Sequence, residues 1–186
     1  MKNSPDLALV DWLKIVIPNN VNEIEDIVLT KPYRITNAYQ ELFSGYKIKS
    51  AEEIITITER VQENSYTGLV SGLSIDYMSF CAHHFLPFFG KVDIIYEPND
   101  LIIGIGKLSR LVDYRTKKFN IQENIAKELC DDLMGFANAK GVFVRVTARH
   151  SCLCYRGPTK YHSENIVTYS TGSCQTKQND IKLILD

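Results

Sequence analysis

The chain has 186 residues, enough for one domain, or one domain with an N-terminal extension, and for a substantial hydrophobic core. Its 45% hydrophobic and 23% charged residues are ordinary for a soluble globular protein, and its net charge of −1 gives no overall reason to bind nucleic acid or an anionic membrane. No apolar run approaches the ~20 residues that span a bilayer. Five cysteines, an odd number at low density, do not suit a secreted disulfide scaffold, so we expect a cytoplasmic protein.

The first part of the chain is predicted to be helical. Residues 5–16 form one predicted helix, with Ser4 as the N-cap and Pro5 in the first helical position. A second runs from about residue 31 to 43, and the polar stretch that follows holds one short predicted strand at 54–57.

From residue 68 the pattern favours strands. Predicted strands cover an interrupted run from 68 to 80, then 90–96, and finally 166–171; the apolar segment 101–105 is predicted to form a hairpin with 90–96. Two helices are predicted between them, one over 107–118 and one capped by Asn120.

Gly141 begins the clearest strand. If it continues through Cys154, the side chains of His150, Cys152 and Cys154 lie on one face, because strand side chains alternate. The tail after residue 171 is predicted to be a polar end. The order of elements indicates an α+β fold with a mainly antiparallel sheet over residues 51–186, preceded by an N-terminal helical region, 1–50.

Two clusters of soft metal-ligand residues stand out in this pattern. Cys81 and His84 are separated by two residues, so one turn can direct both side chains at one ion, and Cys152 or Cys154 arrives from a distant strand. Two thiolates and one imidazole are the three-ligand set of a catalytic zinc site, which keeps a fourth position open. Spacing leaves open which cysteine binds; the other is then a small buried hydrophobe.

Two further histidines flank the ligands. His83 lies between Cys81 and His84, and His150 lies two residues before Cys152. Both are predicted to move protons near the metal.

A second group of residues is suited to a nucleotide. Lys107 and Arg110 follow a strand at the start of a helix, where backbone N–H groups favour anions, and Arg156 adds a third cation; the simpler alternative is a solvated helix face. Gln122 and Glu123 lie near a predicted helix start. Glu123 there either stabilises the helix, by interacting with the positive end of its dipole, or binds an N–H-rich ring such as guanine.

From roughly residue 31 to 172 the chain resembles GTP cyclohydrolase I. The matching segments are Cys81-Ala82-His83-His84, Pro87–Lys91, Tyr96–Asn99, Ile103–Arg110, Ile121–Glu123, and His150-Ser151-Cys152 through Arg156-Gly157. The resemblance implies a tunnelling fold, with antiparallel sheet and a helix pair, assembled as a homo-oligomeric ring, usually a decamer, with active sites at subunit interfaces. It implies hydrolysis of GTP to 7,8-dihydroneopterin triphosphate and formate, in folate, pterin or deazaguanine synthesis.

The resemblance also implies roles for individual residues. Cys81, His84 and Cys152 would bind Zn²⁺, so that Cys152 is preferred to Cys154, and His83 and His150 would be the acid/base pair. Gln122 and Glu123 would hold guanine, and the triphosphate would be held by Lys107, Arg110 and Arg156.

The chain departs from the family at three of these places. Ala82 replaces the Glu of the Cys-Glu-His-His motif, Gly106 replaces a common Ser, and Asn120 begins the run in which the family has Gln-x-Gln-Glu. These departures leave two alternatives for the activity: an enzyme that opens another purine nucleotide or stops at a ring-opened formamide, and a non-catalytic nucleotide-binding homologue.

Overall fold

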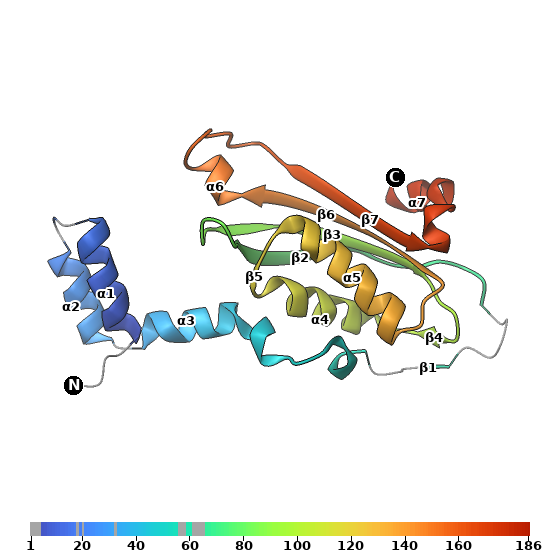
Figure 1. Cartoon of the computed structure of the whole chain (residues 1–186), viewed down its shortest axis with the longest axis horizontal. Coiled ribbons are helices and arrows are strands. Elements are labelled where there is room, and N and C mark those ends of the chain that lie inside the picture. The colour runs from blue at the N-terminus through green and yellow to red at the C-terminus, as the bar shows by residue number, and fades with distance from the viewer. Residues whose placement is uncertain (1–4, 18, 20, 32, 56–58, 61–65) are drawn as a thin grey trace. The chain divides into compact units, whose positions relative to one another are not determined.

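The computed structural model describes residues 5–17, 19, 21–31, 33–55, 59–60 and 66–186 (Figure 1). The chain forms two compact units, Met1–Phe43 and Ser44–Asp186, each considered by itself. Within the described ranges, every helix is too short or too polar to cross a membrane.

The first unit contains three helices, α1 (Pro5–Val16), α2 (Asn22–Thr30) and α3 (Arg34–Leu42). Val10, Val21 and Val28 form its small buried cluster. The buried Asp6 accepts hydrogen bonds from the backbone N–H and the hydroxyl of Thr36, which ties α1 to α3. The predicted helix over 5–16 is confirmed, and its Ser4 cap lies outside the described residues.

The second predicted helix, about 31–43, contains α3, but α2 was not predicted. Ile24, Ile27 and Val28 have the i, i+3, i+4 spacing of a helix. Only Val28 of this helix is buried, so the apolar stripe is short and its signal in the sequence is weak.

The second unit is built on a five-stranded sheet. The strands are β2 (Val70–Cys81), β3 (Pro87–Glu97), β5 (Phe119–Asn120), β6 (Gly141–His150) and β7 (Asn165–Gly172), in the order β5-β2-β3-β6-β7. Neighbours are antiparallel, except that the short β5 runs parallel to the end of β2. The strands predicted over 68–80, 90–96 and 166–171 are confirmed.

The helix pair covers one face of this sheet (Figure 1). α4 (Ile105–Thr116) and α5 (Gln122–Phe136) contribute buried residues such as Leu111 and Leu129, which belong to the same core cluster as Ile94 and Val144. Alternate strand residues point to the opposite face, where Ile95 and Phe143 join a second cluster. That cluster is completed by the 3-10 helix η3 (Ser173–Gln175) and by α7 (Gln178–Leu185).

Four short elements complete the unit: the 3-10 helices η1 (Ser44–Lys47) and η2 (Ala51–Glu53), the strand β1 (Glu59–Arg60), and β4 (Leu101–Ile102), which pairs with β1. The predicted hairpin between 90–96 and 101–105 is therefore wrong, because β2 and β6 already occupy both sides of β3. The strand predicted at 54–57 is not found at Ile54 and Ile55, which are buried in a turn after η2; residues 56 and 57 lie outside the described ranges.

Three further predictions differ from the structure. The strand from Gly141 ends at His150, because Ser151–Cys154 forms the helical turn α6, closed by the bond from Tyr155 N to Ser151 O at 3.0 Å. Asn120 does not cap α5: the N-cap residue is Ile121, and the Asn120 side chain accepts the Ile121 N–H instead. The tail is not simply polar, because Ile181 of α7 is buried.

The predicted fold class is confirmed: an α+β arrangement of a mainly antiparallel sheet and a helix pair, preceded by N-terminal helices.

Candidate active site

The first two predicted metal ligands come from the turn after β2. Cys81 is the last residue of β2 and is 5% exposed. Its carbonyl accepts the N–H groups of His84 at 3.3 Å and Phe85 at 2.8 Å, and Phe85 adopts a left-handed φ of 57°. This tight turn folds the imidazole of His84 back, so that its Nδ1 lies 3.8 Å from Cys81 Sγ.

Cys152 reaches the same place from α6. One ligand atom from each of Cys81, His84 and Cys152 lies within 4.8 Å of the others, which makes these three the group among the described residues that can hold a metal ion. The helical turn of α6, not the predicted strand, directs Cys152 to this group. Cys154 is 1% exposed and lies outside this group, so the geometry favours Cys152 as the third ligand.

The two thiols of the cluster influence each other. Burial, and then the neighbouring Cys81, raise the pKa of Cys152, while the charge of Arg156 opposes the rise. Arg156, which is exposed, is thus near enough to the cluster to act on it electrostatically.

The two flanking histidines lie beside the cluster. His83 Nδ1 is 3.8 Å from Cys81 Sγ. The ring of His150 stacks on Phe88 with centroids 4.4 Å apart and planes 5° from parallel. Burial lowers the pKa of His150, and the charge of Glu123 opposes this shift.

Gln122 fixes the orientation of His150. The Gln122 side chain is buried, and its Nε2 donates to the carbonyls of Val146 at 2.8 Å and Asn165 at 2.9 Å. Both amide hydrogens are thereby used, so the Oε1 atom, 3.1 Å from His150 Nε2, acts as the acceptor. His150 therefore carries a hydrogen on Nε2 and keeps Nδ1 for proton exchange, and no Gln122 donor is left for a ligand.

These residues surround one cavity of about 530 Å³. It is lined by the cluster, both flanking histidines, the first turn of α5, and the start of β7: Cys81, His83, His84, Ile121, Gln122, Glu123, His150, Cys152, Leu153, Glu164, Asn165, Ile166 and Val167. Sequence reasoning missed Glu164 as a site residue. Its only signal was that His162 and Glu164 do not suit the Ser/Thr-rich end of the resembling family.

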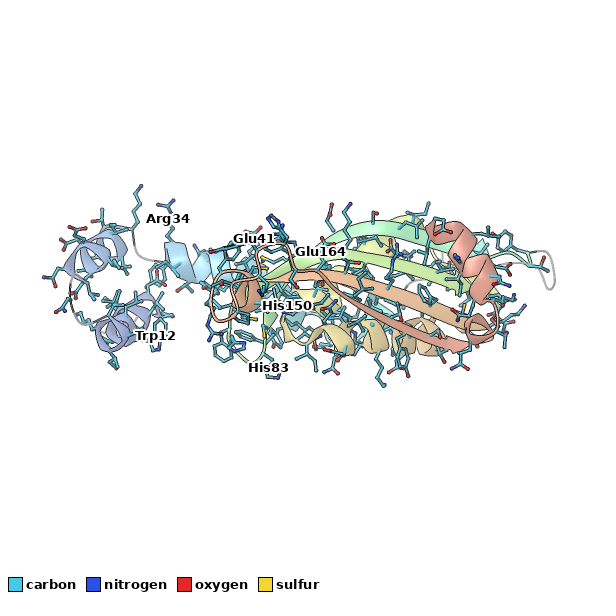
Figure 2. All side chains as sticks on the ribbon, turned by 90° about the horizontal axis from the view of Figure 1, so that it is seen from above. Trp12, Arg34, Glu41, His83, His150 and Glu164 are labelled. Carbon is cyan, nitrogen blue, oxygen red and sulfur yellow. The ribbon has the colours of Figure 1, made fainter. Side chains whose placement is uncertain are left out.

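The three predicted phosphate-binding cations do not line this cavity. Lys107 and Arg110 lie in the first half of α4. The opposite end of this helix is the one near the turn after β2, because Lys118, which follows α4, accepts a hydrogen bond from the backbone N–H of Phe80. The structure therefore brings together the predicted ligands, the histidines, Gln122 and Glu123, but not Lys107 and Arg110. Of these residues, Figure 2 labels His83 and His150.

A mixed-sheet α+β domain with a Cys–His–Cys cluster and two histidines in one cavity defines a candidate metal-dependent enzyme. The chain belongs to the GTP cyclohydrolase I family, whose family model matches residues 13–186. It is 36% identical over 157 residues to GTP cyclohydrolase 1 of Clostridium perfringens (strain 13 / Type A), covering 83% of each chain. It is also 35% identical over 172 residues to GTP cyclohydrolase 1 of Streptococcus pneumoniae (strain Taiwan19F-14), covering 92% of this chain and 90% of that protein.

Among solved structures, the crystal structure of the archaeosine synthase QueF-Like in the apo form is similar over 59% of this chain and 98% of that chain, with 19% identity and a TM-score of 0.47. No functional conclusion follows from so distant a likeness.

Proposed function

We propose that this chain opens the imidazole ring of GTP by zinc-dependent hydrolysis and gives 7,8-dihydroneopterin triphosphate and formate. The observation that carries the proposal is one cavity that unites the Cys81–His84–Cys152 cluster with His83, His150 and Glu123. Membership in the GTP cyclohydrolase I family supports the same reaction.

The donor set of the cluster fits zinc. Two thiols and one imidazole suit this borderline-soft ion, and ligand atoms within 4.8 Å of one another can share one tetrahedral ion. Three protein ligands leave a position open, as in catalytic zinc sites. When bound, zinc supplies a water of pKa ~7 for hydrolysis near neutral pH.

His83 and His150 are proposed as the acid/base pair. Gln122 and the stacked Phe88 hold the His150 ring, so its Nδ1 can give or take a proton without reorientation. Glu123 is proposed to hold the guanine ring, since a carboxylate pairs with two parallel N–H groups. Both N–H donors of the Gln122 side chain are engaged within the protein. We therefore propose that Gln122 does not contact guanine and instead acts by orienting His150.

Lys107, Arg110 and Arg156 are proposed to bind the triphosphate, with Lys107 and Arg110 supplied by a second copy of the chain. Among the described residues, the cavity has no Lys or Arg in its lining, although its proposed substrate is polyanionic. A homo-oligomeric ring with active sites at subunit interfaces would bring α4 of one subunit to the cavity of the next. Mass photometry of the purified protein tests this assembly; a monomer that turns over GTP at full rate would refute it.

The proposed product belongs to folate or pterin synthesis. A reducing cytoplasmic setting agrees with all five cysteines being free thiols.

Product analysis tests the proposal. The zinc-loaded protein is expected to release one formate per GTP and to give a fluorescent pterin after oxidation. We expect His150→Ala to slow formate release by about 10²- to 10⁴-fold, the usual contribution of a general acid or base. His162→Ala is the matched control, because the exposed His162 does not line the cavity.

A second function is favoured by Ala82, which stands where the family motif has Glu. The enzyme would then open another purine nucleotide or stop at the ring-opened formamide. Formate or a formamide without pterin supports this alternative. Tight GTP binding without turnover, unchanged in His150→Ala, would instead identify a non-catalytic homologue.

A further inference from the structure

Glu164 gives the cavity a second carboxylate that none of the roles above uses. It lines the cavity beside the metal cluster, and Figure 2 shows it at the same end of the second unit as His150 and His83. Within the described part of the chain, its carboxylate has neither a hydrogen bond nor an ion pair, and it is exposed. It is therefore available to a ligand.

The backbone fixes the position of Glu164. The next residue, Asn165, begins β7, pairs with Ala148 of β6, and accepts the hydrogen bond of Gln122 Nε2 at 2.9 Å. Gln122 also contacts His150, so one buried amide holds the ring of His150 and the start of β7 together. The residue next to Glu164 in the chain is thus held by the same contacts that orient His150.

Glu164 lines two cavities: this one, and a second one that also contains Lys91 and Arg149. The charge of the cavity beside the cluster restricts what Glu164 can bind there. Glu123 and Glu164 are its carboxylates, and no Lys or Arg among the described residues lines it. A carboxylate accepts hydrogen bonds and repels phosphate oxygens and the acceptor atoms of a purine. On a guanine nucleotide, the hydrogen-bond donors are the N–H edge of the ring and the hydroxyls of the ribose.

We propose that Glu164 binds the ribose hydroxyls of the nucleotide, the 3′-hydroxyl included, and selects GTP over a nucleotide that lacks this hydroxyl. The inference rests on the proposed function, in which Glu123 takes the N–H edge of guanine, so the ribose diol is the donor group that remains. Carboxylates bind ribose hydroxyls in this way in dinucleotide-binding folds.

Formate release from GTP and from 3′-deoxy-GTP tests the inference, because ring opening at the purine does not require the 3′-hydroxyl. Loss of a hydrogen bond to a charged group corresponds to roughly a 10- to 100-fold change. We expect the wild-type protein to prefer GTP by about this factor in kcat/KM, and Glu164→Gln and Glu164→Ala to lose the preference through a weaker reaction with GTP. Glu52→Gln, an exposed carboxylate outside the cavity, is the matched control.

Unchanged discrimination in both Glu164 variants would overturn the inference, and so would an equal loss with both nucleotides. A loss of bound zinc with unchanged nucleotide preference would do the same, since it would place Glu164 at the metal instead. Dissociation constants for GTP and 3′-deoxy-GTP, measured on the same zinc-loaded proteins, separate the two proposals. If the wild-type protein releases no formate, the proposed function fails, while the ratio of these constants still tests the ribose contact.

Discussion

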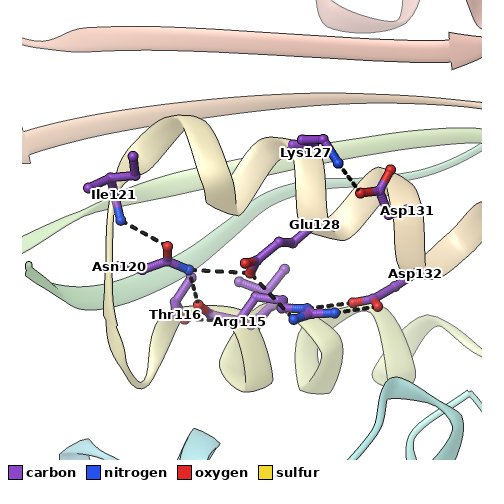
Figure 3. Close-up of polar contacts among 9 residues, drawn as sticks. Arg115, Thr116, Asn120, Ile121, Lys127, Glu128, Asp131 and Asp132 are labelled. Carbon is purple, nitrogen blue, oxygen red and sulfur yellow. Dashed lines mark hydrogen bonds and ion pairs between the residues drawn. The ribbon is translucent and has the colours of Figure 1, made fainter.

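Removing Arg115 is expected to destabilise the fold strongly, because Arg115 neutralises a buried carboxylate. Its Nε and Nη2 atoms donate to Asp132 at 2.7 and 2.5 Å, joining α4 to α5 (Figure 3). The Asp132 side chain is only 3% exposed, and Arg115 itself is 20% exposed. Glu128, at 3.4 Å and 36% exposed, cannot replace this pairing.

The size of the effect follows from the burial of Asp132. In Arg115→Met, the buried Asp132 carboxylate loses its partner, and breaking a buried ion pair in this way costs about 3–5 kcal/mol. With a urea m-value of about 2 kcal/mol/M, the unfolding midpoint falls by roughly 1.5–2.5 M.

Urea unfolding followed by circular dichroism, at one fixed protein concentration, measures this effect. The double variant Arg115→Met/Asp132→Leu is expected to recover most of the loss, because it leaves no unpaired buried charge. Lys127→Met is the control: its ion pair with Asp131 lies on the surface of α5 (Figure 3), so little change is expected. A loss below about 1 kcal/mol in Arg115→Met, or no recovery in the double variant, would refute the reasoning.

The remaining predictions concern acid stability, close packing and the metal. Burial raises the pKa of Glu97, but hydrogen bonds from Lys177 and a neighbouring serine outweigh it, so the folded pKa lies below the ordinary 4.5. The stability from Glu97 is present above that value and is lost as pH falls through the folded pKa; thermal melting of Glu97→Gln should therefore show a smaller loss on acidification than wild type. Gly90→Ala is expected to destabilise the fold by about 1–3 kcal/mol or more, because the added Cβ would meet the backbone of β6. Gly106→Ala has open space around it and should stabilise α4 by up to about 1 kcal/mol. Equal effects of the two substitutions in chemical denaturation would contradict this. Cys154→Ser should retain zinc in a metal assay, since Cys154 is outside the ligand group; zinc loss would show that it binds.

Period-two alternation in the sequence correctly predicted the long strands, because successive side chains of a strand point to opposite faces of the sheet and pack in different clusters there. It failed where tertiary contacts decide the backbone. Nothing in the alternation from Val142 to Cys154 marks the change to a helical turn after His150. This turn is what brings Cys152 to Cys81 and His84. Likewise, Leu101–Ile102 pairs with β1 because β2 and β6 occupy both edges of β3. This order of strands in the sheet cannot be seen in the local sequence.

The candidate site was predictable where function depends on residue type at short spacing. Cys81 and His84 lie in one turn, so their spacing in the sequence is enough to predict that their side chains are close. The distant Cys152 could be chosen only by residue type, as a thiol that can bind a metal. Gln122 and Glu164 depend on long-range contacts instead. The Gln122 amide is engaged by carbonyls of β6 and β7, and Glu164 is placed by the start of β7, which no local pattern specifies.

The central claim is that Cys81, His84 and Cys152 hold a zinc ion that hydrolyses GTP. Formate release from GTP, measured with zinc content in the same samples before chelation, after chelation and after zinc is restored, tests it most directly. We expect one zinc per chain, loss of formate release when the metal is removed, recovery when zinc is added, and no recovery in Cys152→Ser. Full formate release from the metal-free protein, or from Cys152→Ser, would contradict it.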